Sequence, residues 1–407
     1  MQGYYYTFNS VLAFQVFAEL GLGTVLTYCA SHEWSKLSLS QEGRIIGDAE
    51  SLSRLQSLGR FALRWYLVAA VALTLVLAIG GSLFFWNSSG QDPQWRSPWL
   101  LLCVVTGLVL LSVPIWAMLE GCNEVANVYT YRLAQSLASG VAAWIAITMG
   151  AGLWTASISG LAGFLAMSVL VGIRYGKYLR SVFFERSSGP RLDWKSEVLP
   201  MQWRIAVSWI SGYFAFCLFT PVLFHYQGAA VAGQMGMTWA IVSALMAVAS
   251  SWVAPKAPKF GILIAQRRFA ELDALFWRVT SAVVAVTGIG AIAVWLLVAS
   301  LNAIDHPFAQ RLLSPQATAC LLGATVIVSA SLPMSTYLRA HKKEPLLVLS
   351  VLSGLVTGVS VLILGRYYSA EGVAIGYLIV TAAITPFVAL VWYRRRIDWH
   401  AADPISI

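Results

Sequence analysis

Charged side chains are scarce in this sequence of 407 residues. They make up 11% of it, whereas about a quarter of an ordinary soluble domain is charged. Hydrophobic residues make up 58% of the chain, and the mean hydropathy is +0.70. A chain this apolar cannot be an ordinary soluble protein. We therefore expect an all-α polytopic membrane protein.

Several signatures of chemical sites are also missing. The sequence contains no phosphate-binding glycine loop, no GxSxG elbow and no HExxH pair. Its five cysteines lie in or beside apolar segments at no metal-like spacing, so we interpret them as small packing residues. We therefore expect no cofactor and no metal. Without a nucleotide site, any transport is expected to be secondary, driven by an ion gradient or by substrate supply.

Long apolar runs dominate what is present. About 20 apolar residues are needed for one helix to cross the hydrocarbon. By this measure we expect eleven transmembrane helices, at residues 4–31, 65–86, 99–119, 133–152, 154–173, 204–225, 233–253, 277–299, 317–338, 345–365 and 371–393.

The basic residues orient these helices. Seven of them fall in the longest polar interruption, at residues 174–204, and basic loops are retained on the cytoplasmic side. With alternate loops on opposite sides, all of the 27 basic residues except Arg96, Arg311 and Arg366 become cytoplasmic. This topology places the N-terminus in the periplasm and the C-terminus in the cytoplasm. The net charge of +9 is thus interpreted as a membrane-topology signal, and we expect no nucleic-acid partner.

The same basic loop divides the chain in two. We expect an N-terminal transmembrane lobe of five helices at 1–173, a basic cytoplasmic linker at 174–203, a C-terminal lobe of six helices at 204–393 and a cytoplasmic tail at 394–407. Residues 5–20 align with 236–251, and residues 112–121 align with 331–340. The matches are in the same order in both halves, which indicates two homologous lobes in parallel repeat.

Two polar stretches and four prolines add detail. Residues 32–64 and 256–278 are basic and amphipathic, and we expect each to form a helix lying at the cytoplasmic interface. Kinks are expected at prolines within spans, namely Pro114, Pro221, Pro333 and Pro386.

Glu19 is the one ionisable residue that we place deep within a span. Gln15 precedes it by four residues and projects from the same helical face. Because a desolvated carboxylate is costly, we expect Glu19 to face a cavity, to hold a proton or to meet a cation. The alternative is a protonated glutamic acid that is hydrogen-bonded to a neighbouring helix.

Four local strings carry a family resemblance: GYYYTFNSVLAFQVFAELGLG near the N-terminus, QWRIAVSWISGYFAFCLFTPVLFHYQG and GQMGMTWAIVSAL after the linker, and AEGVAIGYLIVTAAITPF near the C-terminus. With two six-helix-type lobes and a basic linker, the chain resembles the multidrug/oligosaccharidyl-lipid/polysaccharide exporter superfamily. The strings are most similar to its polysaccharide branch, the O-antigen and lipopolysaccharide flippases.

This resemblance implies a fold and a substrate. The fold would be a MATE-like two-lobe bundle, and the substrate would be a polyprenyl-pyrophosphate-linked oligosaccharide that crosses the bacterial inner membrane by alternating access. The implied partners are this lipid-linked substrate, membrane lipids, and H⁺ or Na⁺ for coupling. Such proteins normally have twelve spans or more and begin inside the cell. The eleven spans expected here suggest that the first helix of lobe one is absent, or that the start codon is assigned too late.

Spans expected to line a cleft between the lobes supply the candidate residues. They are Gln15, Glu19, Arg204, Trp209, Tyr213 and Gln234. Arg204 would meet a pyrophosphate through its guanidinium fork, although it also suits a positive-inside anchor. Trp209 and Tyr213, one helical turn apart, would stack on sugar rings.

Two other functions remain open at this stage. A MATE-type drug/cation antiporter of the same fold could use Glu19 for coupling. A membrane-bound glycan polymerase or ligase would need a large outward loop, and the longest outward loops expected here are short, at residues 87–98 and 300–316. We therefore do not expect an enzyme.

Overall fold

The computed structural model describes residues 2–40, 44–89, 93–185, 189–194, 198–253, 256, 259–260, 263–264, 266–341 and 345–401. It divides into two units, each with its own packing. Unit 1 contains Phe8–Ile210, and unit 2 contains Gln2–Thr7 together with Ser211–Ile407. The division falls inside one helix near the middle of the chain.

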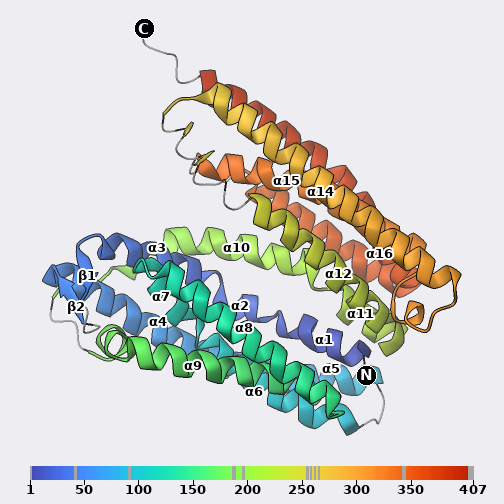
Figure 1. Cartoon of the computed structure of the whole chain (residues 1–407), viewed down its shortest axis with the longest axis horizontal. Helices are drawn as coiled ribbons and strands as arrows, with labels where there is room; N and C mark the ends of the chain where they lie inside the picture. Colours follow the sequence, from blue (N-terminus) through green and yellow to red (C-terminus); the bar gives the residue numbers. More distant parts are fainter. Residues whose placement is uncertain are drawn as a thin grey trace. The chain divides into compact units, whose positions relative to one another are not determined.

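Unit 1 contains these elements in chain order (Figure 1): α1 Gln2–Leu12, α2 Gln15–Glu19, α3 Leu22–Trp34, β1 Leu37–Leu39, β2 Ile45–Gly47, α4 Ala49–Val76, the π-helix η1 Leu77–Gly81, α5 Ser82–Ser89, the 3₁₀-helix η2 Pro93–Trp95, α6 Arg96–Leu110, α7 Val113–Gly121, α8 Val125–Thr148, α9 Trp154–Phe183 and the first part of α10 Leu199–Phe216. The first residues of α1 belong to unit 2.

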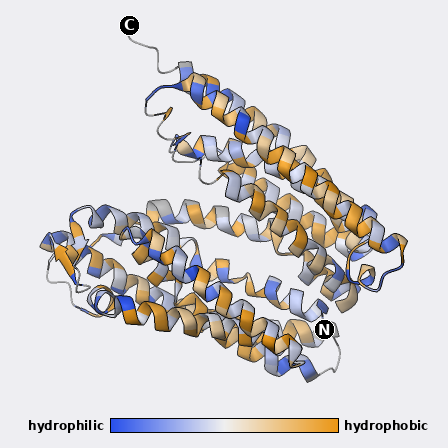
Figure 2. Ribbon diagram, viewed as in Figure 1, coloured by the Kyte–Doolittle hydropathy of each residue, from blue (hydrophilic) through white to orange (hydrophobic). Residues whose placement is uncertain are grey.

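Unit 2 continues with α11 Phe219–Gln227, α12 Ala229–Val253, α14 Phe269–Ala303, the 3₁₀-helix η5 Ala309–Arg311, α15 Pro315–Ala340 and α16 Leu347–Ala401. In Figure 1, α14, α15 and α16 run alongside one another, as α8 and α9 do in unit 1. Figure 2 shows hydrophobic colouring over the long middle parts of these helices and hydrophilic colouring in the described loops between them.

The fold is that of a multi-pass membrane protein. Among the described residues, eight helices are long and apolar enough to span a membrane, and the bent pair formed by residues 2–19 and 22–34 would be a ninth. The expected count of eleven is not confirmed. Helix α8 is not among the eight, and Arg132 and Gln135 lie in its polar first half. The two last expected spans form one assigned helix, α16, with non-helical backbone at Tyr368 and Ser369.

The first amphipathic stretch differs from the expectation. Residues 37–39 and 45–47 form two short antiparallel strands, in which Leu37 pairs with Gly47 and Leu39 with Ile45, where a helix was expected. The rest of the stretch, from Ala49 onward, belongs to helix α4, which is capped by Asp48, whose carboxylate accepts a hydrogen bond from the Ser51 N–H. Part of the second stretch, residues 256–278, lies outside the described residues. From Phe269 onward it belongs to α14.

Proline positions explain two of the helix breaks. The chain stops being helical after Leu110 and resumes at Val113, directly before Pro114. It breaks again after Phe216 and resumes at Phe219, two residues before Pro221. Each proline lacks the N–H that would bond to a carbonyl four residues earlier, so the ladder is interrupted there. Pro333 and Pro386 lie within α15 and α16.

Aromatic side chains form much of each unit's core. In unit 1, the rings of Phe8, Phe85 and Trp99 lie 4.9–5.1 Å apart between centroids. Trp99 also donates to the Leu77 carbonyl at the π-helix, and Gly81 permits this because a Cβ there would collide with the indole. In unit 2, Phe276 stacks on Trp392 at 4.4 Å. Such pairs contribute about 0.5–1.5 kcal/mol beyond their buried area.

Candidate functional site

Glu19 lies at a break in a membrane-spanning segment. It ends α2, and the next two residues, Leu20 and Gly21, have φ values of 49° and 66° in the left-handed region. Glycine adopts this conformation without steric cost, whereas a leucine there is strained. The result is a bend of 44° between the segments 2–19 and 22–34, with the carboxylate at the bend. Glu19 is 9% exposed.

Two other elements converge on this carboxylate at Gly23. A Cβ built on Gly23 would lie 3.0 Å from Glu19 Oε1, 3.1 Å from Val113 Cγ1 and 3.7 Å from the Tyr66 hydroxyl. Tyr66 is fully buried, and its hydroxyl lies close to the Gly23 backbone and makes no hydrogen bond of regular geometry with the described residues. Buried polar groups normally have partners. Gly23 therefore allows an acid, a hydroxyl and an apolar side chain to approach one another where an added methyl group would be crowded, and the acid and the hydroxyl are both shielded from solvent.

A row of aromatic rings leads away from Glu19 along α4. The Trp65 indole donates to the carbonyl of Ala18, which directly precedes Glu19. Phe61 stacks on Trp65 at 6.3 Å and on Trp194 at 3.8 Å between centroids. We call Trp65, Phe61 and Trp194 the aromatic ladder. It connects the linker region to the break in the first span, and all three residues belong to unit 1.

Linker residues 189–192, which precede Trp194, are hydrogen-bonded to α4. The Ser53 hydroxyl donates to the Pro190 carbonyl and accepts from the Gly189 N–H. One turn later, the Ser57 hydroxyl accepts from the Leu192 N–H. These bonds fix residues 189–192 against α4 and thereby position Trp194 on Phe61. The segment is thus attached to unit 1.

Two arginines lie on α4 next to the aromatic ladder in sequence. Arg60 and Arg64 lie on α4 on either side of Phe61 in sequence. Arg64 is exposed, while Arg60 is half-buried and its Nε donates to the Gln56 carbonyl. Guanidinium groups bind phosphate oxygens through paired N–H donors, and aromatic faces provide flat apolar surfaces. The combination can contact a ligand that has both phosphate and ring-shaped polar parts.

The remaining predicted site residues lie in several places. Gln15 begins α2 and is half-buried. Arg204 lies on α10, but its side chain is outside the described residues. Trp209 is 39% exposed and belongs to unit 1, whereas Tyr213 is 4% exposed and belongs to unit 2. The structure therefore gives these two residues, one turn apart on α10, different surroundings.

Gln234 lies in unit 2 and lines a cavity of about 440 Å³. Its side-chain amide donates to the Gln310 carbonyl at 3.0 Å. Asp305 and Glu371 line the same cavity. Gln234 and Glu19 thus belong to separate features of the molecule, each within its own unit.

The sequence prediction did not include Tyr66 or the aromatic ladder. The spacing of Phe61 and Trp65, four residues apart on one helical face, was the available signal. No local pattern indicates that Trp194, in a polar linker, packs against Phe61. Among the described residues, no group of three or more His, Cys, Asp and Glu side chains is arranged to hold a metal ion.

Comparisons with known proteins identify the fold. No protein-family model matches the sequence, and no curated protein matches it. Among solved structures, an inward-facing multidrug resistance MATE family transporter of the MOP superfamily matches with a TM-score of 0.76 at 15% identity, covering 100% of this chain and 94% of that one. A MATE structure in the bent conformation matches with a TM-score of 0.63 at 14% identity, covering 96% of this chain and 86% of that one.

A third similar structure is a MOP superfamily transporter from Pyrococcus furiosus. Its TM-score is 0.58 at 14% identity, over 96% of this chain and 86% of that one. For that transporter, the reverse polarity of the binding pocket suggests a different function. These matches extend over nearly the whole chain, so the protein has a MATE-like transporter fold.

Proposed function

We propose that this protein is a secondary transporter that moves a polyprenyl-pyrophosphate-linked oligosaccharide across the bacterial inner membrane by alternating access. The MATE-like fold supports a transporter, since the similar solved structures are transporters. The sequence contains no phosphate-binding glycine loop, which favours a secondary mechanism. The strings that resemble polysaccharide flippases favour a lipid-linked glycan as the substrate.

The aromatic ladder is the observation that carries this substrate assignment. Sugar rings have apolar faces edged by hydroxyls, and they suit stacking on Phe61, Trp65 and Trp194. Arg60 and Arg64 on the same helix suit the pyrophosphate that joins the glycan to its lipid. The lipid tail would remain in the bilayer. A site for an organic cation would instead favour acidic groups, and the ladder is accompanied by basic ones.

The distribution of basic residues supports the direction of transport. The ladder begins at the linker, which the positive-inside bias assigns to the cytoplasm. Lipid-linked oligosaccharide made on the cytoplasmic leaflet would therefore meet Trp194 and Phe61 first and Glu19 afterwards. In this topology the N-terminus is periplasmic and the C-terminus is cytoplasmic.

Glu19 is proposed to couple transport to an ion. A carboxylate inside a span is a functional candidate by default, and this one lies at a helix break beside the Tyr66 hydroxyl. Binding of H⁺ or Na⁺ would neutralise it. The same feature favours one alternative function, a MATE-type drug/cation antiporter.

Tests of the proposal use complementation of a strain that lacks its polysaccharide flippase. Trp65→Leu should reduce surface polysaccharide strongly, because it removes the ring of the ladder that lies nearest Glu19. Trp144→Leu is the matched control, since Trp144 is 72% exposed on α8 and distant in sequence from the ladder. Both variants should accumulate in the membrane to the same level.

Glu19→Gln tests the coupling role in the same strain. It retains the size of the side chain and should abolish transport while the protein still inserts normally. Full complementation by both Trp65→Leu and Glu19→Gln would show that neither feature serves the transport of a glycan. Unchanged polysaccharide with increased sensitivity to cationic compounds on gene deletion would instead establish the antiporter.

A further inference from the structure

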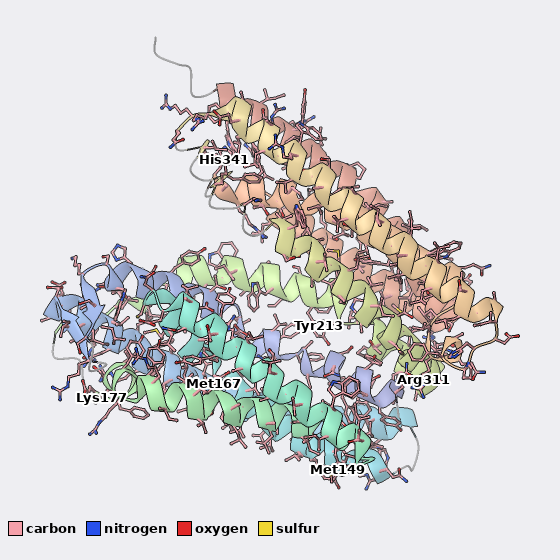
Figure 3. The ribbon with its side chains drawn as sticks, in the orientation of Figure 1. Met149, Met167, Lys177, Tyr213, Arg311 and His341 are labelled. Atoms are coloured by element: carbon pink, nitrogen blue, oxygen red, sulfur yellow. The ribbon has the colours of Figure 1, made fainter. Side chains whose placement is uncertain are left out.

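The cavity around Gln234 is formed within unit 2 by four parts of the chain. Gln234 comes from α12, and Asp305 and His306 from the segment that follows α14. Ser314 directly precedes α15, and Glu371 follows the non-helical backbone of α16. The cavity volume of about 440 Å³ is within the range of ligand sites in proteins. Figure 3 places Arg311, next to this segment, at the opposite end of unit 2 from His341.

Hydrogen bonds hold the walls of this cavity in place. The Ser314 hydroxyl donates to Glu371 Oε1 at 3.2 Å and accepts from the Ala317 N–H, which caps α15. The Thr238 hydroxyl accepts from the Leu313 N–H. Together with the bond from Gln234 to Gln310, these contacts join α12, α15 and α16 through one loop. A site fixed in this way requires little reorganisation on binding.

The charges of the cavity exclude one class of ligand. Two carboxylates line it, those of Asp305 and Glu371, together with the imidazole of His306. Among the described residues that line it there is no lysine and no arginine. A phosphate or pyrophosphate in the cavity would be repelled by the carboxylates, and no lysine or arginine among the described lining residues would offset this repulsion. The ligand must therefore be neutral or positively charged.

The mixture of polar groups favours a neutral sugar over an organic cation. Carboxylates accept two hydrogen bonds from neighbouring hydroxyls, and the Gln234 and Asn302 amides can both donate and accept. Among the described lining residues, Tyr368 is the single Phe, Tyr or Trp, and it is 67% exposed. Cages for organic cations generally use aromatic faces around the charge. One ring beside many hydrogen-bonding groups is more suited to a pyranose.

We propose that this cavity binds neutral sugar rings of the transported glycan on the periplasmic side. The loops that form it, at residues 300–316 and 366–371, are those that the basic-residue pattern assigns to the periplasm. The inference rests on the proposed function for the source of the glycan. In this proposal the two units contact the substrate through different groups. Unit 1 uses basic and aromatic side chains, and unit 2 uses carboxylates and amides.

Binding of defined small ligands to the full chain in lipid nanodiscs tests this inference. Saturation-transfer NMR would use N,N′-diacetylchitobiose and maltose as neutral sugars, inorganic pyrophosphate as the anion, and tetraphenylphosphonium as the organic cation. We expect at least one disaccharide to bind and pyrophosphate not to compete with it. Glu371→Ala and Asp305→Ala should each weaken disaccharide binding by about tenfold, because each removes charged hydrogen-bond acceptors.

Glu271→Ala is the matched control. Glu271 is an exposed acid in the first turn of α14, the helix whose last turns reach the cavity, and it pairs with Arg268. Its replacement should leave disaccharide binding unchanged. The inference is overturned if only tetraphenylphosphonium binds at Glu371 and Asp305, or if no disaccharide signal depends on these two residues. Disaccharide binding without restored surface polysaccharide would refute the proposed function alone, and restored polysaccharide without such binding would refute only the cavity.

Discussion

Replacing Gly23 with alanine should disturb the Glu19 site selectively. The added Cβ would lie 3.0 Å from Glu19 Oε1 and 3.1 Å from Val113 Cγ1, so both groups must move by a few tenths of an ångström. Overpacking of this kind costs about 1–3 kcal/mol. Alanine also gains about 1 kcal/mol from helix propensity. We expect the free energy of unfolding to fall by about 0–2 kcal/mol, the net of these two terms.

Gly140→Ala provides the control for this substitution. Gly140 lies inside α8, and a Cβ there would meet nothing within 4 Å, so only the gain in propensity applies. Thermal inactivation of the purified protein in detergent should therefore occur at a lower temperature for Gly23→Ala than for Gly140→Ala. Gly23→Ala should also reduce surface polysaccharide in the complementation assay, because the Glu19 carboxylate is displaced.

A double substitution identifies the cause of the effect. In a Glu19→Ala background the closest contact of the new methyl group is gone, so Gly23→Ala should cost less than it does alone. Residues in contact typically show coupling of about 0.5–3 kcal/mol. Equal costs in both backgrounds, or a Gly23→Ala protein as stable and as active as Gly140→Ala, would refute the described packing at Glu19.

Three other predictions follow from the described contacts and the topology. In a cysteine-free background, cysteines at positions 89 and 188 should react with impermeant reagents from opposite sides of the membrane, and labelling from one side would overturn the topology. The Ser51 N–H lowers the pKa of the Asp48 carboxyl below its usual value of about 3.9, so this cap should stabilise the protein above about pH 4 and be lost at lower pH. Asp48→Asn should flatten the plot of unfolding free energy against pH in this range, and an unchanged plot would exclude the effect. Arg396 donates to both carboxylate oxygens of Asp273, so Arg396→Ala should lower the free energy of unfolding by about 1–3 kcal/mol. Adding Asp273→Ala should lower it little further, and additive losses in thermal unfolding would show that the pair is not coupled.

Much of the fold follows from simple features of the sequence. Apolar runs of about 20 residues predict spanning helices, and the structure has helices at each of the expected positions, although the number of complete spans is not confirmed. Pro114 and Pro221 correctly indicated breaks. The strands at residues 37–39 and 45–47 were wrongly predicted as part of a helix. Leu37 and Leu39 alternate with polar residues, as in a strand, and this period of two was outweighed by the overall amphipathic composition.

The candidate site was predictable only in part. Burial of Glu19 follows from its position deep in an apolar segment, because an isolated carboxylate cannot remain solvated there. Its neighbours Tyr66 and Val113 lie 47 and 94 residues further along the chain, and nothing local connects them to it. The position of Trp194 could not be predicted either, since its packing on Phe61 depends on serines of α4 that bind the linker. Contacts of this kind are decided by tertiary packing.

The central claim is that this protein moves a lipid-linked glycan between leaflets, and flipping in proteoliposomes tests it most directly. Vesicles would contain the full chain and a fluorescently labelled polyprenyl-pyrophosphate-linked oligosaccharide, with an impermeant quencher outside. We predict that the quenchable fraction changes with time in vesicles containing the protein, and that Glu19→Gln stops this exchange. A glycan that stays in its original leaflet, while the same vesicles exchange an organic cation for protons or sodium, would contradict the account and establish the antiporter.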